Sequence, residues 1–258
     1  MMKKIFLFAL LIILISCSKK EKALNRFRAD YVNESSNEER EMTKAIVYGK
    51  TKKIEKIIEN DDSIILRSYN ENYSSYLHLA VHIENIKSVE TLLKLGFNPN
   101  VKDKIGGTPL YYASGHSIYP YEEDDKLTKI LYLLLDYGAE PNQHIGEQEN
   151  TPLMNLVGQQ VFKENYLTRA KLLVEKGKAD VNLKNKYDAT ASDLALLDSV
   201  SCLGMNHITR FYAFNEAIKT AHYLIVTCHS DVKSGFYYNR SKEDIVLIYP
   251  VQLLRRLT

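Results

Sequence analysis

Apolar residues recur at helical spacing in the middle of the chain, and they predict a helix that begins at Pro109. Leu110 and Ala113 lie three residues apart, so they share one face of a helix. The Thr108 hydroxyl can cap the N-terminus of this helix, and proline fits its first position, where the missing N–H is not needed. Gly106 can take the positive φ of the turn that leads into the helix.

A second apolar stripe follows and predicts a partner helix that runs back along the first. Leu131, Leu134 and Leu135 form its apolar face, and Gly138 suits a left-handed cap at its end. One such pair of helices cannot bury its apolar faces alone, so further copies must stack beside it.

The same pattern recurs along the chain, 33 residues from Ser75 to Thr108 and then, across longer connections, 43 and 39 residues to Thr151 and Thr190. The helix openings read Ser75-Tyr76-Leu77-His78-Leu79-Ala80, Thr108-Pro109-Leu110, Thr151-Pro152-Leu153 and Thr190-Ala191-Ser192-Asp193-Leu194-Ala195. The closings read Gly96-Phe97-Asn98-Pro99-Asn100, Gly138-Ala139-Glu140-Pro141-Asn142 and, after Gly177, Ala179-Asp180-Val181-Asn182. A degenerate first copy contains Ala45-Ile46, Gly49, Ile54 and Ile57-Ile58.

These openings and closings, at this period, resemble the ankyrin-repeat family from about residue 38 to residue 228. The resemblance implies an all-α solenoid of about five helix-turn-helix repeats, with hairpin fingertips between the repeats. After the repeats, residues 229–258 form a tail that we expect to add a short helix or an apolar strand to the last repeat.

The N-terminus predicts a lipid anchor. Lys3 and Lys4 precede an apolar run of about eleven residues, which is half of what a bilayer span requires. The run ends in Leu14-Ile15-Ser16-Cys17, which resembles a bacterial lipoprotein signal. That resemblance implies that residues 1–16 are a signal peptide, that Cys17 is acylated, and that residues 17–37 form a polar tether. The expected location is the cell envelope, either periplasmic or surface-exposed; the alternative is an ordinary signal peptide that contains a cysteine.

The charge balance argues against a nucleic-acid partner. Lysine and arginine number 34 against 32 aspartates and glutamates, and Lys3 and Lys4 are the only charged residues before Cys17. The chain from Cys17 onward is therefore about neutral, without the basic excess that nucleic-acid binding needs.

Candidate chemistry is sparse. His78 and His82 lie one helical turn apart, but the family resemblance gives His78 a structural role in tying neighbouring repeats together, and no third metal ligand is evident. Cys202 and Cys228 fall at opposite ends of an antiparallel helix pair, too far apart for a disulfide, so we expect free thiols. The sequence therefore predicts no enzyme, metal, cofactor or small-molecule substrate.

The resemblance implies that the chain binds another protein through its fingertips and inner helices. Ile105 and Ile145 are the most informative candidates, because an exposed apolar fingertip contributes nothing to an isolated solenoid. The candidate partner-binding residues are Tyr69, Glu71, Asn72, His82, Ile83, Lys102, Lys104, Ile105, His144, Ile145, Glu147, Gln148, Lys184, Lys186 and Tyr187.

Three longer connections, at residues 115–125, 158–165 and 199–213, fall at the turn between the two helices of a repeat and offer a rival surface. The first contains Tyr119 and Tyr121, followed by the acidic run Glu122-Glu123-Asp124-Asp125. The functions that remain open are an envelope scaffold or adaptor, an immunity or inhibitor protein that occludes a toxin or enzyme, and an enzyme hidden in these connections.

Overall fold

The computed structural model describes residues 39–66, 74–115, 126–158, 165–195, 219–228, 237–239 and 244–246, together with Ala29 and Val32. The predicted lipoprotein signal with Cys17 and nearly all of the proposed tether lie outside these residues. So do the candidate fingertip residues Tyr69, Glu71 and Asn72, most of the three longer connections, and Cys202. The first-repeat helices are α2 (Arg40–Val47) and α3 (Thr51–Asn60), followed by η1 (Asp62–Leu66).

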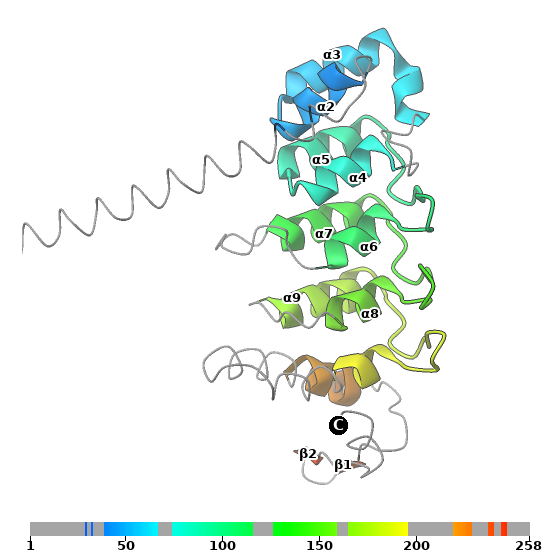
Figure 1. The fold of residues 1–258 in the computed structure, drawn as a ribbon. Helices are drawn as coiled ribbons and strands as arrows, with labels where there is room; N and C mark the ends of the chain where they lie inside the picture. The colour runs from blue at the N-terminus through cyan, green and yellow to red at the C-terminus, as the bar shows by residue number, and fades with distance from the viewer. Residues whose placement is uncertain are drawn as a thin grey trace, which may run out of the picture.

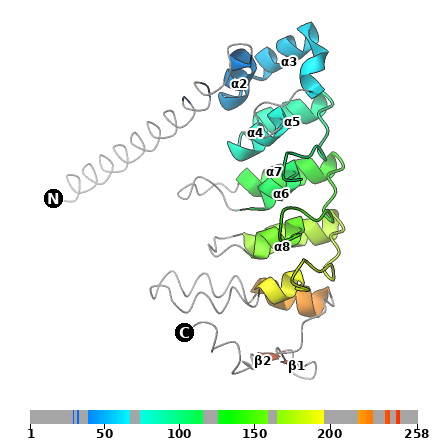
Figure 2. The same cartoon turned by 45° about the vertical axis from the view of Figure 1, so that its right-hand side comes forward.

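Helix pairs stack one upon another along the chain (Figures 1 and 2). The next pairs are α4 (Tyr76–His82) with α5 (Ile86–Lys94), α6 (Pro109–Ser114) with α7 (Lys126–Asp136), and α8 (Pro152–Val157) with α9 (Tyr166–Lys171), which η2 (Leu172–Lys176) continues. A last pair consists of residues 191–195 and of residues 219–222 with η4 (Tyr223–Thr227). These pairs confirm the predicted all-α ankyrin-repeat solenoid.

The helices form two layers. The first helices of the repeats pack on one another, α4 against α2 and α6, and α6 against α8. The second helices do the same, α5 against α3 and α7, and α7 against α9 and η2. We call α2, α4, α6 and α8 the inner helices, and α3, α5, α7 and α9 with η2 the outer helices.

The predicted core and helix caps are confirmed. Leu110 and Leu134 are fully buried, at 0% exposure. The Thr108 hydroxyl accepts a hydrogen bond from the Tyr111 N–H at 3.2 Å, and Pro109 occupies the first turn of α6. The same arrangement recurs at Thr151 for α8, with the Met154 N–H at 3.3 Å.

The fourth repeat contains one extra residue, which a π-helical turn absorbs. In the third repeat the Ala139 N–H donates to the Leu134 carbonyl, whereas in the fourth the Ala179 N–H donates to the Leu173 carbonyl, one residue further away. The helix widens over Leu172–Lys176 to take up this residue, as π-bulges do. Lys178, at φ 61°, then occupies the left-handed position that Gly138, at φ 85°, holds in the third repeat.

Outside the repeats, β1 (Tyr237–Asn239) and β2 (Asp244–Val246) form an antiparallel pair. The described part of the tail is thus a pair of short strands, and the expected packing of a strand on the last repeat stays a prediction. The thiol of Cys228 is free and half-buried, and burial raises its pKa.

His78 ties the second repeat to the third, which confirms its structural role. The Ser75 N–H lies 3.1 Å from His78 Nδ1, and the Gly107 carbonyl lies 3.1 Å from His78 Nε2. An N–H can only donate and a carbonyl can only accept, so Nδ1 is the acceptor and Nε2–H the donor. The ring is therefore neutral, and burial lowers the pKa of His78, although the Gly107 carbonyl and the charge of Asp103 oppose the shift.

The closing asparagines tie further repeats together through the backbone. Asn100 Nδ2 donates to the Gly138 carbonyl at 2.9 Å, and its Oδ1 accepts from the Glu140 N–H at 2.8 Å. Asn142 does the same one repeat later, with the Lys178 carbonyl at 3.4 Å and the Asp180 N–H at 2.8 Å. These ties hold each hairpin in register with the next.

The neutral state of His78 predicts a pH dependence of stability. The pKa of histidine is about 6.5 in an unfolded chain and is lower in the fold, so the unfolded chain binds the additional proton between these two values. Stability is therefore complete above pH ~6.5 and falls as the pH drops toward the folded-state pKa, by at most about 1.4 kcal/mol per pH unit for one proton.

We expect His78→Gln to flatten this dependence, as measured by urea unfolding at a series of pH values between about 7.5 and 5. His144→Gln, at an exposed position of the second fingertip, is the matched control and should change the slope less. Equal slopes in the wild type and the His78 variant would contradict the assignment.

Candidate functional site: the fingertip ridge

Three hairpins precede α6, α8 and the helical residues 191–195, all on the same edge of the stack (Figure 1). They consist of residues 101–107, 143–150 and 183–189, and we call them together the fingertip ridge. The ridge contains four lysines and four carboxylates, so it is neutral in sum.

The first hairpin is organised around the carboxylate of Asp103. Its Oδ1 accepts hydrogen bonds from the N–H groups of Gly107 at 2.7 Å and Ile105 at 3.0 Å, and its Oδ2 accepts from the Tyr112 hydroxyl. A side chain at Gly107 would lie 2.8 Å from the Tyr112 ring and hydroxyl, so any larger residue would displace Tyr112 from this network. The network holds Ile105 outward, where 62% of its surface is exposed.

Tyr112 connects this hairpin to α6. Burial and the hydrogen bond to Asp103 raise the pKa of the Tyr112 hydroxyl. The Tyr112 ring also packs edge-on against His78, with 5.8 Å between the ring centroids. The fingertip is therefore fixed to the same inter-repeat contact that His78 makes with Gly107.

The third hairpin repeats this design with an amide in place of the carboxylate. Asn185 Oδ1 accepts from the N–H groups of Tyr187 at 3.0 Å and Ala189 at 3.1 Å. Asp188 takes the left-handed conformation, at φ 59°, that Gly106 takes in the first hairpin. Tyr187, three residues before Thr190, is thus equivalent to Ile105, three residues before Thr108, and it is 63% exposed.

The second hairpin differs, and the prediction that Ile145 is an exposed anchor is wrong. Ile145 and Asn150 exchange two backbone hydrogen bonds of 3.1 Å, so this hairpin has one more residue between its paired positions than the first has between Asp103 and Gly107. Ile145 consequently occupies the inward position of Asp103 and is 2% exposed. Gln148, three residues before Thr151, takes the exposed position that Ile105 takes in the first hairpin.

Neighbouring hairpins are joined directly. The Lys186 N–H donates to the Gln148 carbonyl at 3.0 Å, and Asn185 Nδ2 donates to Asn150 Oδ1 at 2.8 Å. The second and third fingertips therefore form one continuous surface.

The structure places the remaining candidates as follows. Ile83 is 3% exposed and packs in the core one turn after Leu79, so its predicted place on the binding surface is wrong. His144 is exposed and donates from Nδ1 to the Glu149 carbonyl at 2.9 Å. The other candidates that the structure shows as exposed are His82, Lys102, Lys104, Glu147, Gln148, Lys184 and Lys186.

Two features have no counterpart in the sequence prediction. Arg169 of the fourth repeat is buried, and its Nη1 donates to the Gly115 carbonyl of the third repeat at 2.9 Å. A groove on the outer helices contains Tyr132, which is 49% exposed. Exposed aromatic residues in a helix were the available signal for the groove, but the sequence alone does not show which helices meet there.

The described residues contain no set of three histidine, cysteine or acidic side chains placed to hold a metal ion. None of the helices in the described part of the chain is long and apolar enough to span a membrane. The ridge offers exposed apolar groups among charges of both signs, an arrangement that suits contact with another protein.

Comparison with known proteins agrees with this geometry. Residues 73–104 match the family model described as "Ankyrin repeat". The chain is also 32% identical over 133 residues to the nuclear factor NF-kappa-B p105 subunit of Gallus gallus, a match that covers 51% of this chain and 12% of that protein. The stacked helix pairs, with this repeat among them, identify an all-α ankyrin-repeat solenoid, whose repeats indicate a protein–protein interaction domain.

Proposed function

We propose that the chain is a membrane-anchored, non-catalytic scaffold or adaptor that holds a partner protein on its fingertip ridge. The observation that carries this proposal is the pair of exposed apolar side chains at equivalent positions, Ile105 and Tyr187. Each is held outward by hydrogen bonds that backbone N–H groups of its hairpin donate to one side-chain oxygen, that of Asp103 or Asn185. A surface ordered before binding loses less conformational entropy in the complex, which raises affinity.

The two side chains lie two repeats apart, about 20 Å if each layer of packed helices adds ~10 Å. A partner domain can span this distance in an interface of ordinary size. The exposed Lys102, Lys104 and His144 then form part of a polar rim around the apolar contacts.

Capture from cross-linked envelopes tests the proposal. The full chain serves as bait beside the variant Ile105→Asp/Tyr187→Asp. A protein retained by the first and lost from the second supports binding on the ridge, whereas equal capture by both baits contradicts it.

The anchor gives a separate prediction. Cys17→Ala should release the chain from the membrane fraction, because the apolar run before it is too short to span a bilayer. Partition between a detergent phase and an aqueous phase measures this, and Cys202→Ala is the matched control that should stay in the detergent phase. Retention of the Cys17 variant in detergent would rule out lipidation at this residue.

A further inference from the structure

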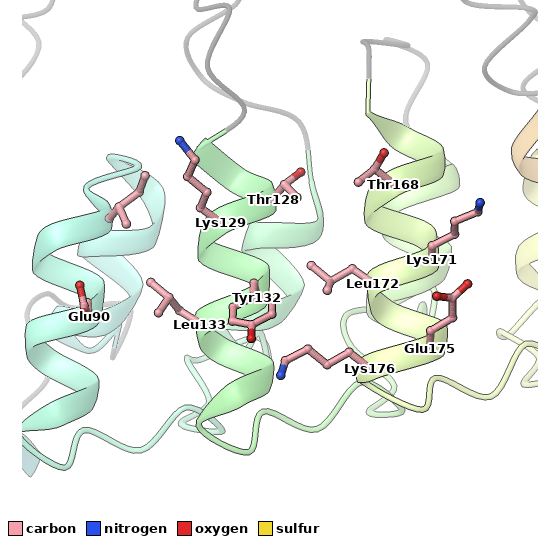
Figure 3. Close-up of a pocket in the computed structure, with 11 residues that line it drawn as sticks. Glu90, Thr128, Lys129, Tyr132, Leu133, Thr168, Lys171, Leu172, Glu175 and Lys176 are labelled. Carbon is pink, nitrogen blue, oxygen red and sulfur yellow. The ribbon is translucent and has the colours of Figure 1, made fainter.

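The outer helices form a groove (Figure 3), and Figure 1 shows α5, α7 and α9 on a different side of the stack from the fingertip ridge. The groove has a volume of about 640 Å³ and crosses α5, α7 and α9 with η2. Leu133 and Leu172 point into the spaces between these helices, and Ile86 adds a third aliphatic side chain. The floor of the groove is therefore apolar.

Three lysines and two glutamates, Glu90 and Glu175, surround this apolar floor, and two of the lysines are held in place by aromatic rings or a carboxylate. Lys176 Nζ lies 4.3 Å from the centroid of the Tyr132 ring and 2.8 Å from Asp136 Oδ1. Lys171 Nζ lies 5.5 Å from the centroid of the Tyr223 ring. Lys129 is the third lysine of the groove, toward the start of α7.

The charge of this face is distinct from that of the ridge. The outer helices carry ten lysines or arginines, of which Arg169 is buried, against five carboxylates, so their exposed side chains sum to +4, whereas the fingertip ridge is neutral. Within the groove lining, three lysines outnumber two glutamates, Glu90 and Glu175. The acidic run at residues 122–125 lies outside the described residues and is not in this count. An apolar groove on a positively charged face attracts a partner segment that is both amphipathic and acidic.

We propose that this groove is a second protein-binding site, which takes an amphipathic helix with an acidic polar face from a partner protein. The concave shape favours a helix, because side chains at positions i, i+3, i+4 and i+7 can enter an apolar groove together. Glutamates on the flanks of that helix then approach Lys129 and Lys171 at the rim. The site does not depend on the fingertip ridge, so the chain can hold two partners at once.

Synthetic helical peptides of about 18 residues, or five turns, test the proposal on the full chain by fluorescence anisotropy. One peptide has a leucine stripe at this spacing with glutamate elsewhere, and a second has lysine in place of every glutamate. A third keeps the glutamates but has serine in place of leucine. We expect the first to bind at least about tenfold more tightly than either of the others.

Matched variants then locate the site. Lys129→Glu/Lys171→Glu and Tyr132→Ser should each weaken binding of the acidic peptide by about tenfold or more at an unchanged melting temperature. Lys102→Glu/Lys104→Glu makes the same charge change on the fingertip ridge and should alter the affinity by less than about twofold.

Three outcomes would overturn the proposal: equal weakening by the groove and ridge variants, equal affinity for the acidic and lysine peptides, or no binding of the acidic peptide. Vesicles with phosphatidylglycerol supply the competing interpretation. If the chain binds these vesicles through Lys129 and Lys171 but does not bind the acidic peptide, this face contacts a membrane surface instead.

Discussion

Replacing Leu110 by alanine is expected to lower the free energy of unfolding by about 2–5 kcal/mol. Leu110 lies in α6 with no exposed surface, and α6 packs between α4 and α8. Removal of the side chain leaves a cavity between three repeats, since closely packed helices relax only in part. Urea unfolding followed by circular dichroism measures the effect.

The effect should reach beyond the third repeat. In a solenoid each repeat contacts only its neighbours, so a weakened middle repeat loses the interfaces on both of its sides. Hydrogen exchange should therefore accelerate in α4 and α8 as well as in α6. Ile105→Ala, which shortens an exposed side chain in the adjacent fingertip, is the matched control and should change stability by less than about 0.5 kcal/mol. An unchanged midpoint for Leu110→Ala would contradict the assignment of this residue to the core.

The combined change Ile105→Asp and Tyr187→Asp is expected to weaken partner binding by more than tenfold, or about 1.4 kcal/mol. Both side chains are exposed in the free chain, at 62% and 63%, so their replacement should leave the melting temperature unchanged. In the complex each aspartate would lie where a partner now meets an apolar surface, and its burial without a counter-charge is unfavourable.

Exposed tyrosines away from the ridge provide the control for this prediction. Tyr48 and Tyr137 are 40% and 38% exposed, at the ends of α2 and α7. Tyr48→Asp combined with Tyr137→Asp makes the same change in charge and should leave the affinity within about twofold. If both double variants weaken binding equally, the ridge has no special role.

The residues that start and end helices predicted the repeats well, because each such signal acts on the backbone within a few residues of itself. A threonine followed by proline favours the start of a helix, and Thr108 and Thr151 both cap as expected. Gly138 ends α7 in the left-handed conformation at φ 85°. The resemblance to the ankyrin-repeat family implied the structural role of His78, and the structure adds the partner, the Gly107 carbonyl of the next repeat.

Register within the second fingertip was harder to predict, because one additional residue moves side chains between the inside and the outside of a hairpin. Ile145 therefore faces inward although its neighbour His144 is exposed. Ile83 shows a different cause of error: it follows Leu79 by one turn, so it continues the buried stripe past the end of α4.

The groove on the outer helices could not be predicted from the sequence, because its lining extends from residue 86 to residue 176. No local pattern indicates that Leu133 and Leu172 leave a hollow between their helices. The depth of such a hollow depends on how helices of neighbouring repeats pack, and the π-helical turn over Leu172–Lys176 lies at its edge.

Photo-cross-linking in living cells is the most direct test of the proposal that the fingertip ridge binds a protein. The photoreactive residue p-benzoylphenylalanine would replace Ile105 or Tyr187 on the ridge, and Tyr48 as the exposed control. The account predicts that both ridge positions give adducts with the same protein and that the control position gives none. Adducts from Tyr48 without any from the two ridge positions would contradict it.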